Sequence, residues 1–420
     1  MAPTNPAAKT AVQNADGEAA DIPLHLTEKV LHRISPLESA RFLTVCKSWA
    51  STIFSRLARP IPHLFALQAS AAQAGEAPRR RGAIFSLPID GSNNELDPVM
   101  PAKLPVMPSH AYANHMRLSG ALPSGCVSFA MDAVGSNHAV LVNPVTGAAQ
   151  SVEVHGTTPS GAPPKVRAVA GAEAFLVSEF GDEGVSIRWR RDGEQQWRAR
   201  KLPIPHKFSF SSDAFDLVAY TDFAFYAMEY FGFTFVVSTR APPHMARLDV
   251  PSILEQYTPI CGPAGFRFLQ SCYMLVSEGE VLFVGPVLDG NKAVGGFEMF
   301  RLDVQGGRWV KVERLAGDRA LFVSEQSSFS VRASETPGCR SNCIYFVTEL
   351  GDKCSNGICN WGVYSMEEDK VLFQSSVGSP GKYIDARWFL PRVGPGLTSP
   401  APSASATTSS AGQKRKIPDA

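Results

Sequence analysis

The sequence predicts an α+β multidomain protein, in which a small three-helix module precedes a mostly-β propeller and both termini are disordered. Apolar residues recur with helical spacing in residues 21–58. Short apolar runs separated by turn-forming residues fill 60–392. The two ends, 1–20 and 393–420, are rich in small and polar residues and show no period.

Composition supports this division and limits the function classes. The chain has 420 residues, 44% of them hydrophobic and 19% charged, which is enough for a sizeable core. A net charge of +1 argues against a general nucleic-acid or membrane-surface binder. We see no apolar run near the ~18 residues of a membrane span, and residues 1–20 lack the apolar centre of a secretory signal. The expected location is the nucleus, the cytoplasm or both.

The first predicted helix carries a stripe of four apolar residues. Leu26, Val30, Leu31 and Ile34 stand at i, i+4, i+5 and i+8. Pro36 ends this helix because proline disfavours α geometry in the residue before it and has no N–H to donate.

A second helical stretch starts directly after this break. Ser35 is placed to cap it, with Pro36 at the first helical position and Glu38 three residues after the cap. Its apolar stripe is formed by Phe42, Val45, Cys46, Trp49 and Ile53. On spacing alone, an ordinary helical hairpin that covers a core is the favoured interpretation.

The residue identities in this module resemble an F-box. The resemblance rests on Pro23, on the apolar residues of the first helix, on Arg41, and on the string VCKSW at 45–49. The usual opening Leu-Pro is Ile22-Pro23 here. The resemblance implies binding to the Skp-type adaptor of a cullin ubiquitin ligase. The residues expected to bind the adaptor are Pro23, Leu24, Leu26, Val30, Leu31 and Ile34, with Trp49 holding the helices together.

The middle of the chain is rich in strands throughout. Runs of strand length, rich in Val, Phe and Tyr, occur at 138–142, 175–178, 233–238, 273–276, 281–284, 297–302, 343–347 and 362–365. Turn formers such as Asn143-Pro144 and Gly306-Gly307 bound them. A sandwich array and a propeller both fit this pattern. An unbroken series of hairpins favours the propeller, with six to eight blades, because radial repetition protects strand edges.

One hairpin shape occurs twice. Trp189, Asp192-Gly193 and Trp197 repeat the order strand, glycine turn and strand with tryptophan that is also found at 300–310. Two copies indicate a blade hairpin without fixing a period.

Three motifs resemble the plant KIB-type β-propeller domain. They are VLVNPVTG at 140–147, YMLVSEGEVLFV at 273–284, and the stretch from FEMFRLD at 297 to NCIYF at 346. The resemblance implies a propeller of the kind that follows an F-box in land-plant proteins. Residues 60–120 match poorly, which leaves the first blade undefined, and Arg79-Arg80-Arg81 fits an exposed insertion.

Four cysteines lie close enough in sequence to be considered as a metal site. Cys339, Cys343, Cys354 and Cys359 are separated by three, ten and four residues, looser gaps than zinc ribbons use. Cys343 also fits an apolar strand. Reduced structural thiols are the favoured interpretation, so we expect neither a metal nor a cofactor.

No catalytic motif is evident in the sequence. It lacks a phosphate-binding loop, HExxH and GxSxG, and its histidines are isolated. We therefore expect a protein that is not an enzyme. The terminal Lys414-Arg415-Lys416 fits either a nuclear-import signal or a soluble tail.

Together, the two resemblances imply the substrate-recognition subunit of an SCF-type ubiquitin ligase, with a protein substrate that the sequence does not identify. A scaffold without a ubiquitin target, a propeller enzyme and a chromatin or RNA protein remain alternatives. Aromatic residues in 223–231 fit either an exposed binding patch or, preferably, two buried strands around a turn at Gly232.

Overall fold

The computed structural model divides the chain into two compact units, Met1–Arg59 and Pro60–Ala420. Each unit is described by itself. The residues described are 23–31, 36–39, 42, 47–57, 61–68, 81–87, 96–104, 116–121, 125–131, 138–153, 166–168, 175–181, 184–189, 198–202, 217–221, 223–229, 232–238, 244–257, 271–289, 293–348, 359–379 and 382–392.

Three short helices make up the described part of the first unit: α1 (Leu24–Leu31), α2 (Pro36–Ser39) and α3 (Lys47–Leu57). The carbonyl of Pro23 accepts the backbone N–H groups of Leu26, at 2.9 Å, and Thr27, at 3.1 Å, so α1 begins where the proline predicts. Pro36 occupies the first position of α2, where its missing N–H costs nothing. Helix α3 contacts both α1 and α2. None of the helices in these ranges has the length and apolarity to cross a bilayer.

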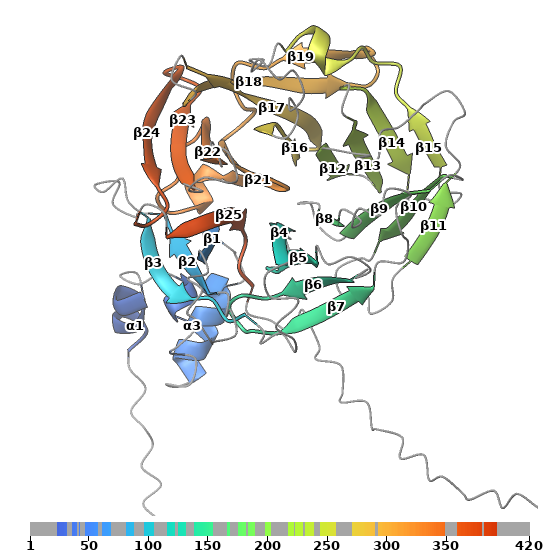
Figure 1. The fold of residues 1–420 in the computed structure, drawn as a ribbon. Helices are drawn as coiled ribbons and strands as arrows, with labels where there is room; N and C mark the ends of the chain where they lie inside the picture. The colour runs from blue at the N-terminus through green and yellow to red at the C-terminus, as the bar shows by residue number, and fades with distance from the viewer. Residues whose placement is uncertain are drawn as a thin grey trace, which may run out of the picture. The chain divides into compact units, whose positions relative to one another are not determined.

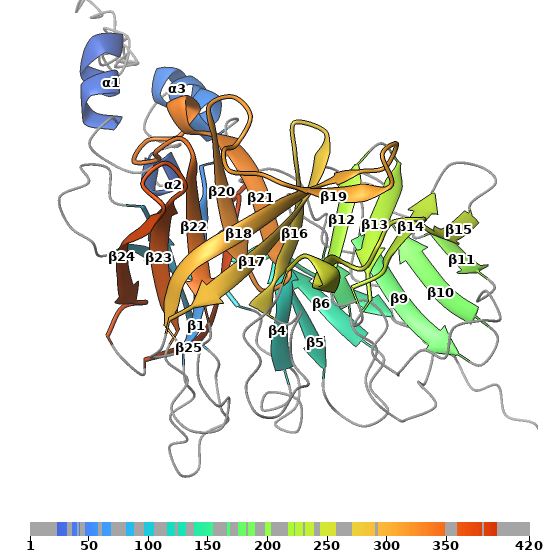
Figure 2. The same ribbon diagram turned by 90° about the horizontal axis from the view of Figure 1, so that it is seen from above.

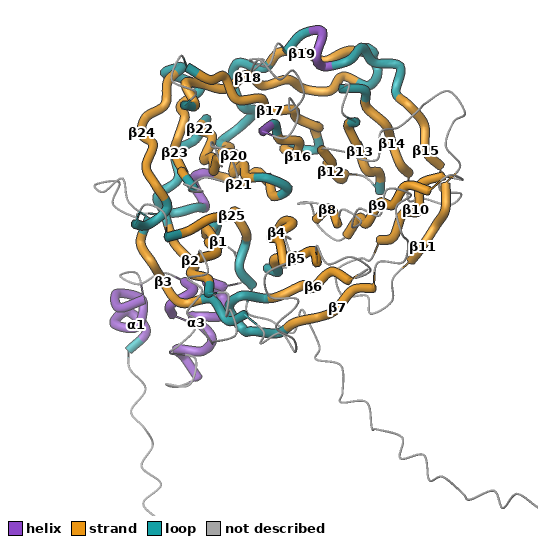
Figure 3. The backbone as a smooth tube through the Cα atoms, viewed as in Figure 1, coloured by secondary structure: helices purple, strands orange, loops and turns teal. Residues whose placement is uncertain are grey.

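The described part of the second unit contains six sheets, arranged as blades around a central axis (Figures 1 and 3). The strands are β1 (His63–Gln68), β2 (Gly82–Ser86), β3 (Asp97–Pro101), β4 (Met116–Ala121), β5 (Val127–Met131), β6 (His138–Val142), β7 (Ala149–Glu153), β8 (Val166–Ala168), β9 (Phe175–Gly181), β10 (Gly184–Trp189), β11 (Arg198–Leu202), β12 (Leu217–Thr221), β13 (Ala224–Met228), β14 (Thr234–Ser238), β15 (His244–Arg247), β16 (Tyr273–Ser277), β17 (Glu280–Leu288), β18 (Val294–Asp303), β19 (Arg308–Lys311), β20 (Arg319–Ser324), β21 (Ser327–Arg332), β22 (Cys343–Thr348), β23 (Asn360–Ser365), β24 (Lys370–Ser376) and β25 (Tyr383–Phe389). Two short 3-10 helices, η2 (Ile253–Glu255) and η4 (Ala333–Glu335), lie between strands.

Four of the six sheets follow the chain order from the centre outward. These are β4 to β7, β8 to β11, β12 to β15, and β16 to β19. The strands nearest the axis are β4, β8, β12 and β16, together with β21 and β25 of the two remaining sheets (Figure 1). Figure 2 shows β9, β10 and β11 side by side within one blade. The predicted mostly-β propeller is confirmed.

The last strand of the chain closes the ring. β25 pairs antiparallel with β1, with His63 opposite Phe389, so the order of this sheet is β25-β1-β2-β3. The first blade therefore takes its inner strand from the C-terminal end of the domain. The sequence left this blade undefined because pairing between residues more than 300 positions apart leaves no local pattern.

The NPVTG motif at 143–147 forms hydrogen bonds with two other segments next to this closure. The Asn143 side chain accepts the N–H groups of Val145 and Thr146 at 3.0 and 3.1 Å, and its amide donates to the carbonyl of Arg392 at 2.9 Å. The carbonyl of Pro144 accepts the N–H of Lys103 at 2.8 Å. The β6–β7 turn is thus bonded to the segment after β25 and to the segment after β3.

Each of the eight predicted strands is present, several of them longer than predicted. The predicted hairpin around Gly232 is also confirmed. β13 and β14 pair from Ala224 opposite Ser238 to Met228 opposite Thr234, Gly232 has φ +78°, and Phe225 is buried. The two similar hairpins, β10–β11 and β18–β19, are the outer pairs of their sheets.

One blade departs from the expected series of hairpins. Its order is β21-β20-β22-β23-β24, and β20 runs parallel to β22. The first strand of this blade along the chain, β20, occupies the second position from the axis. The chain then forms the innermost strand, β21, and passes through η4 before it forms β22. Two hydrogen-bonded neighbours can be parallel only when a crossover separates them, which a hairpin pattern in sequence does not show.

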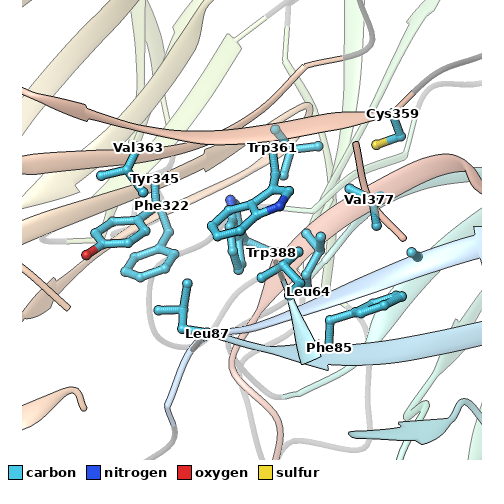
Figure 4. Close-up of a cluster of buried hydrophobic side chains, with 14 of the residues drawn as sticks. Leu64, Phe85, Leu87, Phe322, Tyr345, Cys359, Trp361, Val363, Val377 and Trp388 are labelled. Carbon is cyan, nitrogen blue, oxygen red and sulfur yellow. The ribbon is translucent and has the colours of Figure 1, made fainter. Parts of the chain in front are cut away.

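The largest described core cluster lies between this five-stranded sheet and the β25-β1-β2-β3 sheet. Phe322 stacks on Tyr345 with ring centroids 4.7 Å apart, and Trp388 meets Phe322 edge-on at 5.0 Å. Trp361, Leu64 and Phe85 complete the packing (Figure 4). The closing strand is therefore held by buried aromatic area as well as by backbone pairing.

Strand β17 continues past Val284, where the predicted strand ends, and its Gly285 leaves room for a buried tyrosine ring. A Cβ atom on Gly285 would lie 2.4 Å from Cζ of Tyr257. That buried ring packs on Phe283 and donates its hydroxyl to the Pro286 carbonyl at 2.8 Å. Burial raises the pKa of the Tyr257 phenol, which keeps this donor protonated.

Gly285→Ala is expected to lower the free energy of unfolding by about 1–3 kcal/mol, because the ring must leave its site or the strand must shift. Gly296→Ala on the neighbouring strand is the matched control, since its Cβ would meet only Tyr364 at an ordinary 3.6 Å. Urea unfolding of both variants checks this. Equal losses in the two would show that glycine flexibility, and not the space for Tyr257, matters at position 285.

Candidate functional site

Helix α1 has one buried face and one exposed apolar face. Thr27 and Leu31, four residues apart, are buried, with Leu31 only 1% exposed. Leu26 and Val30, also four residues apart, are 44% and 48% exposed. Leu31 follows Val30 by one residue, about 100° around the helix, so the single predicted stripe is divided between the two faces. The exposed pair is a small apolar surface that folding of the described chain leaves uncovered.

The other predicted adaptor contacts fall into three groups. Pro23 is exposed at the start of α1. Leu24 lies within α1, and nothing is described of its side chain. Ile34 lies outside the described residues. Pro23, Leu26 and Val30 are thus the predicted contacts that the structure shows as accessible.

Trp49 lies in α3 and is 6% exposed. Its ring meets that of Phe42 edge-on, with centroids 5.8 Å apart, and Ile53 is buried one turn later. The placement suits the role predicted for Trp49, which is to hold helices together. Phe42 was part of the predicted stripe but not of the predicted site, and it is 39% exposed.

The cysteines proposed for a metal test lie in an apolar setting. Cys343 and Cys359 belong to the core cluster, and Cys339 packs against it. Burial raises the pKa of the Cys339 thiol to about 12 and also raises that of Cys343. Thiols with raised pKa values are poor nucleophiles and poor metal ligands at neutral pH. Cys354 is outside the described residues, and within those described no three His, Cys, Asp or Glu side chains group as metal ligands would.

The most deeply buried charge in the described propeller is Arg387 on β25, which is 2% exposed. Its guanidinium contacts the carboxylate of Asp385, lies 3.1 Å from Oε2 of Glu325, and donates to the Ala386 carbonyl at 2.9 Å. Glu325 stands in the turn between β20 and β21. The guanidinium charge is paired with two carboxylates, and the group cross-links the closing strand to the neighbouring blade. Sequence reasoning missed it because the acid and the base are 62 positions apart.

Trp388 adds two backbone bonds to this cross-link. Its N–H donates to the Ser324 hydroxyl at 3.1 Å, and its carbonyl accepts the hydroxyl of Ser327 at 2.5 Å. These contacts and the pairs around Arg387 connect charged and polar groups to each other. The arrangement suits stability of the ring closure and offers no free acid, base or nucleophile.

Comparisons with known proteins give one family match. A profile of the KIB1-4 beta-propeller matches residues 103–365. Among curated proteins, the chain is 48% identical over 108 residues to F-box protein At2g26160 of Arabidopsis thaliana, covering 24% of this chain and 32% of that protein. It is 40% identical over 58 residues to probable F-box protein At1g65740 of the same plant, covering 14% of this chain and 15% of that protein. The chain thus aligns with about a third or less of these relatives' lengths.

Solved structures add a distant likeness. A protein of unknown function from Bacteroides caccae aligns with 78% of this chain and 98% of its own, at 12% identity and a TM-score of 0.40.

Proposed function

The chain belongs to the KIB1-4 β-propeller family, and from this premise we propose that it is the substrate-recognition subunit of an SCF-type ubiquitin ligase. In this proposal the α1–α3 module is an F-box that binds a Skp-type adaptor, and through it a cullin. The propeller binds a target protein.

The observation that carries the proposal is the exposed pair Leu26 and Val30 on a helix whose other face is buried. Large apolar side chains grouped on a surface mark protein-interaction sites more often than isolated ones do. Two curated relatives are named F-box proteins, which gives this surface a specific partner class. The string VCKSW at 45–49 supports the same assignment.

The contribution to ubiquitination would be proximity. A receptor that binds adaptor and target together raises the effective concentration of the target near the ubiquitin-charged enzyme. No bond is made or broken by the receptor itself. The paired charges around Arg387 and the protonated thiols of the core suit such a non-catalytic role.

The double variant Leu26→Ala/Val30→Ala is expected to abolish co-purification with a Skp-type adaptor. Removing two apolar anchors weakens an interface by about 2 kcal/mol or more, which is roughly thirtyfold in affinity. Both side chains are exposed, so the free energy of unfolding should change little. Pull-down of the full-length chain with the adaptor, followed by calorimetry, measures the effect.

The matched control is Val287→Ala/Val304→Ala, which truncates two exposed apolar side chains of the propeller unit. It should leave adaptor binding unchanged. Adaptor binding that survives the α1 variant would contradict the F-box assignment. Normal adaptor binding without any partner whose turnover slows on loss of this protein would instead support a scaffold.

A further inference from the structure

The three residues after β25, at 390–392, are packed and hydrogen-bonded, and we call them the strap. Leu390 packs against the core cluster that contains Trp388, and Pro391 is buried. The carbonyl of Arg392 accepts the side-chain amide of Asn143 at 2.9 Å. A segment that follows the last strand of a domain frays unless contacts tie it down. Contacts with the sheet formed by β4 to β7 tie down the strap.

Asn143 uses its two side-chain groups for two different contacts. Its oxygen accepts the N–H groups of Val145 and Thr146, at 3.0 and 3.1 Å, and so holds the β6–β7 turn. Its amide nitrogen is the donor to the strap. An aspartate has the acceptors but lacks the donor, so it could hold the turn but not the strap.

Gly125, which lies two residues before β5, is the second contact of the strap. A Cβ atom at this position would lie 2.5 Å from the backbone nitrogen of Arg392 and 3.2 Å from the carbonyl oxygen of Leu390. Gly125 also has φ +80°, which by itself favours glycine. Gly279 has the same φ, but a Cβ atom there would meet no described atom within 4 Å. The backbone requirement and the space requirement can therefore be separated.

In the described sheets, β25 has a single strand partner. It is the innermost strand of its sheet and is hydrogen-bonded to β1 (Figure 1). Trp388 and Arg387 attach it to the five-stranded sheet. The strap attaches its end to a third sheet. An attachment at the end of a strand stabilises that strand against local opening more than it stabilises distant sheets.

We propose that the strap is a latch, whose docking on Asn143 and Gly125 controls the local opening of β25. When the strap is released, β25 opens more often while the other sheets stay folded. Opening of β25 uncovers the backbone groups of β1 that pair with it in the closed ring. The latch is a conformational device of the propeller and does not depend on the proposed receptor function.

Hydrogen exchange of the full-length chain, followed by mass spectrometry, measures local opening in peptides from 383–392 and, as a reference, from 273–288. Asn143→Asp removes the donor and places a carboxylate against the Arg392 carbonyl. Exchange in 383–392 should become at least about tenfold faster, because the strap loses its hydrogen bond. Thr146→Asp is the control, since it adds the same charge at an exposed position of the same turn, and it should change exchange less than about twofold. The reference peptides should be unchanged in both variants.

A second pair of variants tests the packing of the strap without changing any charge. Gly125→Ala and Gly279→Ala impose the same unfavourable φ, but only the first places a methyl group in the path of the strap. Exchange in 383–392 should be at least about tenfold faster in Gly125→Ala than in Gly279→Ala. This pair tests the latch even if Asn143→Asp folds poorly.

Two results would overturn the latch. Equal exchange in each test variant and its control would show that the strap does not hold β25. Exchange that rises equally in 383–392 and in 273–288 would show a loss of global stability in place of local opening. Adaptor co-purification is measured on the same variants and should be unchanged, so failure of this inference is separable from failure of the receptor function.

Discussion

Trp388→Ala is expected to lower the free energy of unfolding of the propeller by about 3–5 kcal/mol, the range for truncating a buried aromatic side chain. Trp388 is completely buried and meets Phe322 at 5.0 Å and Trp361 at 6.4 Å between ring centroids. The buried apolar area that this substitution removes lies between the β25-β1-β2-β3 sheet and the five-stranded sheet. The damage should therefore reach β1 to β3 as well as β25, because β1 pairs directly with β25. Urea unfolding followed by tryptophan fluorescence measures the total loss.

Trp388→Phe is the control for this prediction. Among the residues that the structure describes, none accepts a hydrogen bond from the indole N–H of Trp388, so a phenyl ring loses volume but no described hydrogen bond. We expect a loss of about 1–1.5 kcal/mol. Limited proteolysis adds a local measurement, since a weakened closure should expose the segment before β1 to cleavage first in the alanine variant. Cleavage confined to other blades would contradict a closing role for Trp388.

Arg387→Met is expected to cost about 3 kcal/mol, at the lower end of the range for breaking a buried ion pair. The methionine replaces most of the side-chain volume but leaves Asp385 and Glu325 without their shared cation. The lower end applies because the Glu325 side chain is 25% exposed and keeps some of its hydration. Thermal and urea unfolding of the full-length chain measure the loss.

Two further variants separate charge from packing. Arg387→Lys keeps the charge but cannot contact two carboxylates with one planar group, so its loss should be intermediate. Arg387→Met combined with Asp385→Asn and Glu325→Gln also removes the two carboxylate charges that the guanidinium contacts, and should recover at least about 1 kcal/mol of the single-variant loss. No recovery would show that the guanidinium acts by filling space alone.

Local features were predictable from the sequence because local rules determine them. The eight predicted strands coincide with alternating or continuous apolar runs. The turn at Gly232 has a positive φ, which glycine adopts readily. Pro36 marks the start of α2. The propeller itself followed from repetition of hairpins, and four of the six sheets are each formed by consecutive strands of the chain in simple order.

The parts that were not predicted depend on residues distant in sequence. The parallel pairing of β20 with β22 depends on which strand reaches the axis, and the need for glycine at position 285 depends on the ring of Tyr257. The predicted adaptor-binding stripe also depended on tertiary packing. Spacing placed Leu26, Val30 and Leu31 in one stripe, while packing buried Leu31 and left the other two at the surface. Which side of an apolar helix is covered depends on its neighbours, and periodicity does not contain that information.

The sequence by itself determined the strands, the turns, the division into a helical and a β-rich part, and the family resemblance, because each of these depends on residues close together in the chain. Tertiary structure alone decided that β25 completes the first blade, that Arg387 joins two blades through Glu325, and that Leu26 and Val30 are left exposed. The physical reason is that burial and strand pairing depend on contacts between residues that are far apart in the chain. Contacts between residues 63 and 389, or 325 and 387, form only when the ring closes.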